Sequence, residues 1–270
     1  MPLARANEIE LFYERHGDAD GEPLLLVVGM SGTHRMWGDP FLQGLTGDGG
    51  LEVIAYDHRG VGQSTRARGE ISTADMAGDA AALLDALSLD SVHVFGISLG
   101  GMVAQQLALR HPDRVRSLTL GCTYCGGPGA RLADEEVVER LNTGLQSGDR
   151  ELAIRTTWEA NVSAQTASDL EAFARFRERV LEVPVPFPVI LAQIRAINAH
   201  DTSGELVRLR APTLIVHGSA DEMLPFENAE IIAGYLPHAR LEVLDGVGHM
   251  FWWERPERAA ELVRAHVLAR

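Results

Sequence analysis

The sequence predicts an α/β protein with a mostly parallel, doubly wound sheet and a helical insertion that forms a cap. Short continuous apolar runs, such as LLLVV at residues 24–28, alternate with amphipathic segments. Such runs are typical of strands buried on both faces, and their alternation with helices is typical of a parallel sheet that is covered on both sides. A further observation is a long segment, residues 126–204, that has helical patterns and no convincing strand.

The predicted strands are the apolar runs that stand between turn-forming residues. They cover residues 24–28, 51–56, 92–95, 116–120, 213–217 and 240–244. Apolar side chains at helical spacing predict helices over residues 71–89, 102–112, 227–237 and 256–268. Because the sites of parallel sheets lie beyond the carboxyl ends of the strands, we expect the functional residues in the loops that follow these runs.

Residues 126–204 interrupt the alternation of strands and helices. The segment begins with the glycine- and proline-rich CGGPGA and ends with AHDTSGE. An insertion of this length between two strands forms a lid over the site at the strand ends in many enzymes. We therefore expect a core made of residues 1–125 and 205–270, and a helical cap made of residues 126–204.

The composition argues against several kinds of partner. The 24 basic and 38 acidic residues give a net charge of −14, which argues against binding to nucleic acid or to an anionic membrane. All 24 basic residues are arginine, so no lysine can form a Schiff base or contact phosphates in a GxxxxGK[ST] loop. No run approaches the roughly 18 apolar residues of a membrane span, and the first residues lack the apolar core of a signal peptide.

Two cysteines, Cys122 and Cys125, form a single CTYC motif. Without a second pair they cannot complete a zinc site, so we expect buried, reduced thiols in a cytoplasmic protein. We expect no metal and no cofactor, because neither HExxH nor a dinucleotide-binding GxGxxG occurs. The expected partner is a small-molecule substrate, and the sequence leaves open whether the protein forms a homodimer.

Two glycine-rich turns each present a serine after an apolar run. Ser98 lies in Gly-Ile-Ser-Leu-Gly, which fits G-x-S-x-G directly after the run 92–95 and before a helical segment. A serine on such a sharp turn needs neighbours without bulk, and the helix that follows directs backbone N–H groups toward negative charge. Ser31, in Gly-Met-Ser-Gly-Thr, lacks the final glycine, and no clean helix follows it. Ser98 is therefore the predicted nucleophile, and Ser31 is a loop serine or a substrate contact.

A serine nucleophile needs a histidine as its base, and that histidine needs an acid to fix its tautomer. His249 is the predicted base because it follows the last strand in LEVLDGVGHM. Asp221 is the predicted acid because it follows the preceding strand in HGSADEMLP, at the same edge of the sheet. We interpret His217 as a packed residue at a strand end, and His34 and His200 as candidates for the pocket.

Four segments resemble motifs of the α/β-hydrolase fold. They are YDHRGVGQS, GISLGGMVAQQLALRHPDRVRSLTL, PTLIVHGSADEMLP and LDGVGHMFWWERPE. Together with the chain order Ser98, Asp221, His249, they make nearly the whole chain similar to the serine hydrolases of that family. Within the family the chain looks most similar to small-molecule esterases and lactonases of the enol-lactone hydrolase and polyketide methylesterase types.

The resemblance also implies an oxyanion hole made by the backbone N–H groups of Met30 and Leu99. Many relatives carry His-Gly where this chain has Val28 and Gly29. The donor in this turn is a backbone group, so the oxyanion hole survives this departure. The departure removes the support that the histidine side chain would normally give to the turn.

The predicted reaction is hydrolysis of a carboxylic ester or lactone of a small, largely apolar substrate through an acyl-enzyme on Ser98. The predicted pocket residues are Ser31, Met36, Trp37, Trp158 and Phe187, and for each aromatic one packing inside the protein is the alternative. Two other functions stay open. One is hydrolysis of a carbon–carbon bond in a ring-cleavage product by the same triad, and the other is ligand binding with weak turnover.

Overall fold

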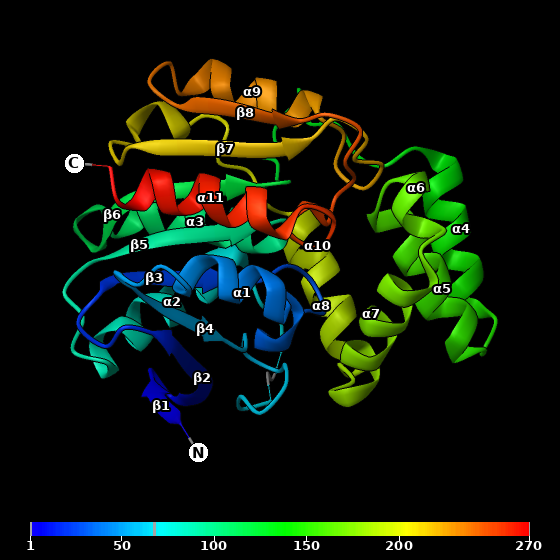
Figure 1. The fold of residues 1–270 in the computed structure, drawn as a ribbon, viewed down its shortest axis with the longest axis horizontal. Coiled ribbons are helices and arrows are strands. Elements are labelled where there is room, and N and C mark those ends of the chain that lie inside the picture. The colour runs from blue at the N-terminus through cyan, green and yellow to red at the C-terminus, as the bar shows by residue number, and fades with distance from the viewer. Residues whose placement is uncertain (1, 67–68, 270) are drawn as a thin grey trace.

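One sheet forms the centre of the molecule. The computed structural model describes residues 2–66 and 69–269, so residues 1 and 270 of the expected core lie outside the described part. Within this part, eight strands form a sheet in the order β1-β2-β4-β3-β5-β6-β7-β8 (Figure 1). The strands are β1 (Leu3–Ala6), β2 (Ile9–Gly17), β3 (Glu22–Val27), β4 (Leu51–Tyr56), β5 (Val92–Ile97), β6 (Val115–Gly121), β7 (Thr213–Gly218) and β8 (Arg240–Leu244).

The strands from β3 onward pair in parallel, and β1 and β2 pair antiparallel at one edge. This arrangement confirms the predicted fold class. Each predicted strand is present, with its ends displaced by no more than two residues. No strand is predicted before residue 24, because β2 buries mainly Leu11 and Phe12 and so lacks a continuous apolar run.

Helices cover both faces of the sheet. Along β3, Leu25 and Val27 pack in one apolar cluster, and Leu24 and Leu26 pack in another, because successive side chains of a strand point to opposite faces. The first cluster includes buried residues of α2 (Thr73–Ala86), α3 (Leu99–Arg110) and α9 (Glu227–Tyr235). The second includes buried residues of α1 (Asp39–Thr46), α10 (Phe251–Glu254) and α11 (Pro256–Val267).

Between β6 and β7 the chain forms helices and no strand. These helices are α4 (Glu135–Gln146), α5 (Arg150–Asn161), α6 (Ala164–Ala167), α7 (Leu170–Glu182) and α8 (Phe187–Asn198). In Figure 1 they lie together beside the end of the sheet toward which the arrow of β7 points. We call this group the cap; its boundaries at residues 126 and 204 stay a prediction.

The described helices include no single one that is long and apolar enough to cross a membrane. Taken together, α7 and α8 have the length and apolar composition of a membrane span, but the two helices are bent by 107° at the break between them. Cys122 and Cys125 are both buried and free, as predicted.

Candidate active site

Ser98 occupies the sharp turn between β5 and α3. Its φ of 53° and ψ of −125° lie in a region that residues other than glycine rarely adopt. Ser98 N–H donates to Gly121 O (3.0 Å), and Thr123 Oγ1 donates to Ser98 O (2.7 Å). A Cβ on Gly100 would lie 1.9 Å from Val27 O. The final glycine of the G-x-S-x-G motif is thus required by contact with the neighbouring strand.

The turn after β3 lies directly beside Ser98, because β3 and β5 are neighbours in the sheet. A Cβ on Gly29 would lie 3.1 Å from the Cβ of Ser98. Among the described residues no acceptor contacts Met30 N–H. Leu99 is the first residue of α3, so its N–H has no acceptor within the helix. Two backbone donors are therefore available next to Ser98.

His249 and Asp221 form a buried pair at the carboxyl edge of the sheet. His249 Nδ1 lies 2.7 Å from Asp221 Oδ2. Asp221 Oδ1 accepts Met223 N–H and Leu224 N–H at 2.9 Å each. Burial alone would raise the pKa of Asp221, but attraction to His249 and hydrogen bonds from His217 and His249 outweigh burial, so this pKa lies well below its usual range. The ionised Asp221 favours a proton on Nδ1 of His249, which leaves Nε2 as the basic atom.

Gly121 contacts both the turn of Ser98 and the first residue of α10, which follows His249. Its carbonyl accepts Ser98 N–H, and a Cβ at Gly121 would lie 2.9 Å from the ring of Phe251, two residues after His249. In the described part of the chain, no direct hydrogen bond joins Ser98 Oγ to His249. Bonds of this kind often tighten only in the substrate complex. The structure thus joins the predicted base and acid directly, and the predicted nucleophile lies at the same carboxyl edge of the sheet, after β5.

His217 belongs to this cluster, although the sequence patterns predict only a packed residue at a strand end. Its side chain is fully buried, and its Nε2 lies 3.0 Å from Asp221 Oδ2 and 2.7 Å from Leu224 O. Both neighbours are acceptors, so Nε2 must carry a proton and donate. His217 is therefore a second donor to the predicted acid. Its position as the histidine of HGSAD, in β7 and four residues before Asp221, is the signal that could have found it.

The turn after β3 is supported by a histidine from the neighbouring strand end. His58 Nε2 lies 2.9 Å from Val28 O. Burial lowers the pKa of His58, which keeps the ring neutral at neutral pH, so Nε2 carries the single proton and donates to this carbonyl. His58 follows β4, and its imidazole holds the backbone of Val28 from the neighbouring strand end.

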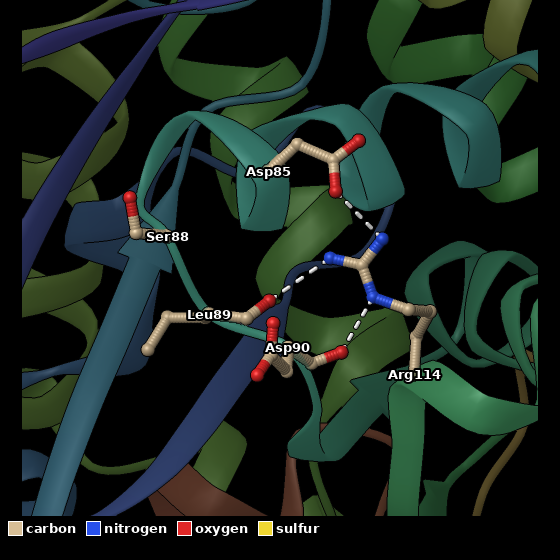
Figure 2. Close-up of a pocket in the computed structure, with 5 residues that line it drawn as sticks. All are labelled: Asp85, Ser88, Leu89, Asp90 and Arg114. Atoms are coloured by element: carbon tan, nitrogen blue, oxygen red, sulfur yellow. Dashed lines mark hydrogen bonds and ion pairs between the residues drawn. The ribbon is translucent and has the colours of Figure 1, made fainter.

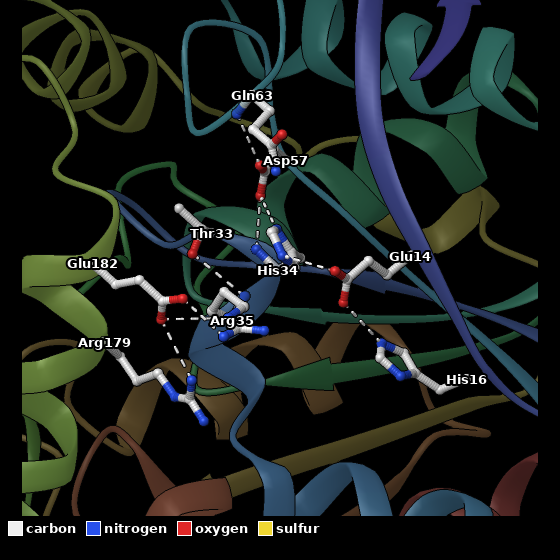
Figure 3. A network of polar contacts seen from close by, with 9 residues as sticks. All are labelled: Glu14, His16, Thr33, His34, Arg35, Asp57, Gln63, Arg179 and Glu182. Carbon is white, nitrogen blue, oxygen red and sulfur yellow. Dashed lines mark hydrogen bonds and ion pairs between the residues drawn. The ribbon is translucent and has the colours of Figure 1, made fainter. Parts of the chain in front are cut away.

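A second Asp–His pair lies next to the same turn. Asp57 Oδ1 lies 2.8 Å from both the backbone N and the Nδ1 of His34, and Asp57 Oδ2 accepts Gln63 N–H at 3.2 Å (Figure 3). His34 is a pocket candidate in the sequence, but its side chain is only 5% exposed and its Nε2 faces Glu14 Oε1 at 3.5 Å. This pair braces the segment after Met30 and does not face Ser98.

An ion pair joins the same segment to the cap. Arg35 Nη2 lies 2.8 Å from Glu182 Oε1, at the end of α7, and Arg179 Nη1 lies 3.4 Å from Glu182 Oε2 (Figure 3). The partners are partly exposed, so each contact stabilises the protein little. The contacts nevertheless show that the segment after Met30 and the cap lie side by side.

Met36 and Trp37 are held inside this segment by packing with α10. The indole N–H groups of Trp252 and Trp253 both donate to Met36 O, at 3.0 and 2.7 Å. Trp37 is fully buried, and its ring lies 5.3 Å from that of Phe95 and 5.9 Å from that of Trp252, measured between centroids. The rings of Phe95 and Trp252 pack against it, so Trp37 belongs to the packed interior and not to the predicted pocket.

The other predicted pocket aromatics also lie elsewhere. Trp158 is fully buried, with its ring 5.1 Å from that of Phe176 and 6.3 Å from that of Trp253. It fills the contact between the cap and α10, which is the alternative that the sequence left open. Phe187, the first residue of α8, is 57% exposed and lies on the surface. Hydrophobicity alone does not distinguish a pocket wall from a packed interior.

His200, another pocket candidate, lies where the cap returns to the core. Its Nδ1 is 3.0 Å from Thr73 Oγ1 and its Nε2 is 3.4 Å from Thr202 Oγ1. Burial lowers the pKa of His200 to about 4, against a smaller opposite effect of Asp201. His200 is thus a neutral structural side chain in a network of hydroxyls.

Glu254 connects the cap to the loop that carries His249. Its carboxylate accepts Gly248 N–H (2.7 Å), Ser163 N–H (3.0 Å) and Thr166 Oγ1–H (2.7 Å), and it also accepts the Ser163 hydroxyl. In addition, Met250 N–H donates to the carbonyl of Asn161, the last residue of α5 (2.7 Å). The residues on either side of His249 are therefore both bonded to groups that contact or belong to the cap.

Two surface cavities have walls that do not include Ser98, Asp221 or His249. The larger, of about 710 Å³, runs between the cap and the core, with Trp253, Arg175 and Glu257 in its wall. The smaller, of about 360 Å³, surrounds Arg114 at the loop after α2. The described residues contain no group of three or more histidine, cysteine, aspartate or glutamate side chains that could hold a metal ion.

The smaller cavity is explained by its own ion pair. Figure 2 shows the Arg114 guanidinium surrounded by Leu89 O (2.9 Å), Asp90 O (2.6 Å) and Asp85 Oδ1 (2.7 Å). The arginine neutralises Asp85 near the end of α2 and binds the carbonyls that follow it. Its donors are already engaged, so this cavity is a structural feature and not a candidate site.

Comparisons with known proteins identify the family of the chain. A protein-family model described as alpha/beta hydrolase fold matches residues 22–256. The chain is 32% identical over 272 residues to a putative carbamate hydrolase, RutD, of Azorhizobium caulinodans, with 97% of each chain covered. It is 28% identical over 298 residues to rhodomycin D methylesterase DnrP of Streptomyces peucetius, covering 97% of this chain and 96% of that protein.

A solved structure gives the same result. The enol-lactonase from Burkholderia xenovorans superposes with a TM-score of 0.84 at 25% identity, covering 97% of this chain and 98% of that chain. A methylesterase and an enol-lactonase are thus both among the similar proteins, as the sequence motifs imply.

Proposed function

We propose that this chain, which belongs to the α/β-hydrolase fold family, is a serine hydrolase that cleaves a carboxylic ester or lactone of a small molecule. In this proposal Ser98 is the nucleophile, His249 is the base and Asp221 is the acid. The observation that carries it is the convergence of a strained serine turn, two free backbone donors and a buried Asp–His pair at one edge of the sheet. Of the predicted pocket residues, Ser31 lies in the turn beside Ser98 and Met36 lies in the short helix His34–Trp37 that follows; both are partly exposed and stay in the proposal.

Acylation begins when Ser98 Oγ attacks the carbonyl carbon while His249 Nε2 accepts the hydroxyl proton. The negative charge that develops on the carbonyl oxygen is stabilised by Met30 N–H and Leu99 N–H. Asp221 keeps its negative charge, holds the proton on Nδ1 and stabilises the imidazolium. His249 then donates the proton from Nε2 to the leaving alkoxide, and the acyl group stays on Ser98.

Deacylation repeats these steps with water. His249 Nε2 removes a proton from a water molecule, whose oxygen attacks the acyl carbon. The ester bond to Ser98 breaks, and His249 returns the proton to the serine oxygen. The product acid leaves, and the residues are back in their starting protonation states.

A fluorophosphonate probe tests the proposal, because it reacts with an activated serine. We expect the wild-type protein to be labelled and Ser98→Ala to lose both the label and the hydrolysis of p-nitrophenyl acetate. Ser31→Ala is the matched control, since it removes the serine of the neighbouring glycine turn and is expected to keep the label. An unlabelled wild-type protein, or label that persists in Ser98→Ala, would contradict the proposed nucleophile.

Carbamates are the second candidate substrates, favoured by the 32% identity to proteins named putative carbamate hydrolase. The same attack on a carbamate carbonyl gives a carbamoyl-enzyme on Ser98, which water then releases. Phenyl acetate and phenyl carbamate share a leaving group, so the ratio of their kcat/KM values compares the two acyl groups directly. A ratio in favour of the carbamate would replace the ester in the proposal while leaving the three residues in their roles.

A further inference from the structure

A glutamine of the cap reaches the oxyanion turn. In α8, Val189, Ala192, Gln193 and Ala196 form the buried stripe of the helix, at the spacing of a face turned to the interior. Gln193 is the polar member of this stripe and is fully buried. Its Oε1 accepts Ser31 N–H at 2.9 Å, across 162 residues of sequence. The side-chain amide therefore lies one residue from the proposed oxyanion donor Met30.

The other half of this amide has no partner. Gln193 Nε2 is buried and makes no hydrogen bond to any described residue. Buried polar groups are nearly always hydrogen-bonded, because an unpaired donor loses its bonds to water and gains nothing in return. Oε1 and Nε2 are bonded to the same carbon. The hydrogen bond between Oε1 and Ser31 N–H therefore also holds Nε2, with its two hydrogens, next to the turn after β3.

A second buried glutamine shows what a structural role looks like in this protein. Gln105, in α3, is also fully buried, but both halves of its amide are bonded. Its Nε2 donates to Tyr124 O at 3.0 Å, and its Oε1 accepts the Thr202 hydroxyl at 2.6 Å. The acceptor function of Gln193 could be supplied by a glutamate or by a hydroxyl. The unpaired donor is the property that needs an explanation.

We propose that Gln193 is a specificity-determining residue whose Nε2–H donates to a neutral oxygen on the acyl part of the substrate. This inference rests on the proposed ester hydrolysis. It deepens that proposal by naming the substrate class: esters or lactones that carry an oxo, hydroxyl or ether oxygen a few bonds from the scissile carbonyl. A neutral amide donor matches a neutral acceptor, and none of the hydrogen bonds of Gln193 among the described residues involves a charged group.

Gln193→Glu separates the two halves of the amide. The carboxylate keeps an acceptor for Ser31 N–H and removes the donor. The substrates are methyl acetoacetate and methyl butyrate, which differ by one oxo group, and pH-stat titration measures the ratio of their kcat/KM values. Their intrinsic reactivities cancel, because the same pair is compared in each protein. Gln165→Glu, an exposed position of the cap, is the matched control for the added charge.

We expect the acetoacetate-to-butyrate ratio to be about tenfold higher in the wild type than in Gln193→Glu, the effect of one hydrogen bond. Gln165→Glu is expected to keep the wild-type ratio. Gln193→Met removes both the acceptor for Ser31 N–H and the Nε2 donor. The acetoacetate-to-butyrate ratio is therefore expected to fall as in Gln193→Glu, and kcat is expected to drop for both esters. Equal ratios in wild type and Gln193→Glu, with normal labelling of Ser98, would overturn the role of Gln193 and leave the proposed reaction intact.

Binding gives a readout that does not depend on turnover. NMR titration measures the dissociation constants of the same two esters in two proteins that cannot acylate. One is Ser98→Ala, which keeps Gln193, and the other is the double variant Ser98→Ala, Gln193→Glu. We expect the preference for methyl acetoacetate to disappear in the double variant. The same preference in both proteins would overturn the inference, whereas an unlabelled wild-type protein would overturn only the proposed hydrolysis.

Discussion

Two Asp–His pairs occupy the same edge of the sheet, and their local geometry is nearly identical. His249 Nδ1 lies 2.7 Å from Asp221, and His34 Nδ1 lies 2.8 Å from Asp57. All four residues are buried. The pairs differ in what the other ring nitrogen meets. Nε2 of His34 faces the carboxylate of Glu14 at 3.5 Å, on the side of β2, whereas Nε2 of His249 has no hydrogen-bond partner among the described residues.

An Asp–His contact is therefore no signature of a base by itself. In both pairs the carboxylate orients the ring, which is all that a pair of this kind can do alone. The Asp57 pair uses this rigidity to hold the backbone after Met30, since the same carboxylate also binds His34 N–H and Gln63 N–H. The Asp221 pair is proposed to use this rigidity for proton transfer. Nε2 of His249 is free to accept a proton, and His249 and Ser98 both lie at the carboxyl edge of the sheet.

Removing each histidine is the strongest test of this difference. We expect His249→Ala to lower kcat by about 10⁴ or more and to destabilise the protein less than His34→Ala, because Asp221 keeps donors from His217, Met223 and Leu224. We expect His34→Ala to destabilise the protein by about 2–3 kcal/mol, because Asp57 is left buried with one partner fewer, and to lower kcat far less. Ester hydrolysis and thermal unfolding measured on both variants check this. Equal losses of kcat in two folded variants would show that both pairs take part in the chemistry.

A buried histidine without a carboxylate partner on its ring sharpens the comparison. The pKa of His200 is about 4, below the ordinary value near 6.5, so at intermediate pH the unfolded chain binds a proton that the folded protein excludes. Stability is therefore lost as the pH falls below about 6.5, and by pH 4.5 this histidine alone accounts for about 2 kcal/mol.

Urea unfolding at pH 7 and pH 4.5 measures this contribution. His200→Gln is expected to be less stable at pH 7, because the contacts to Thr73 and Thr202 change, and to lose less stability on acidification than the wild type. An equal loss in both proteins would mean that His200 is not the titrating group.

The smallest effect is expected at Glu14, the outer neighbour of the Asp57 pair. Glu14 is about one-third exposed, and its contacts with His34 and His16 are long, at 3.5 and 3.6 Å. Pairs of this kind contribute less than about 1 kcal/mol, so Glu14→Gln should leave both stability and kcat nearly unchanged. A tenfold fall in kcat would instead assign His34 a role in catalysis through its Nε2.

The sequence predicts the fold well, and the same strand ends explain why the three residues of the candidate triad lie at one edge of the sheet. Continuous apolar runs mark the parallel strands, and Ser98, Asp221 and His249 each follow one of them. The three residues lie in separate parts of the chain, yet the topology of a parallel sheet brings strand ends together without any knowledge of side-chain contacts.

The residues that the sequence did not reveal act through partners in distant parts of the chain. Gln193 binds a backbone group 162 residues away, and Glu254 binds Ser163 across 91 residues. Helical spacing shows which face of a helix is buried but not what it meets. For the same reason the apolar character of Trp37 and Trp158 could not separate a pocket wall from a packed interior.

The contacts of Glu254 bear on how caps can be exchanged between members of this family. One carboxylate gathers donors from Ser163 and Thr166 of the cap and from Gly248, the residue before His249. A foreign cap that lacks these two hydroxyls would leave a charged group short of partners beside the predicted base. A chimera with a new substrate range should therefore transplant the cap together with residues 248–254, since hydrogen bonds join these two stretches.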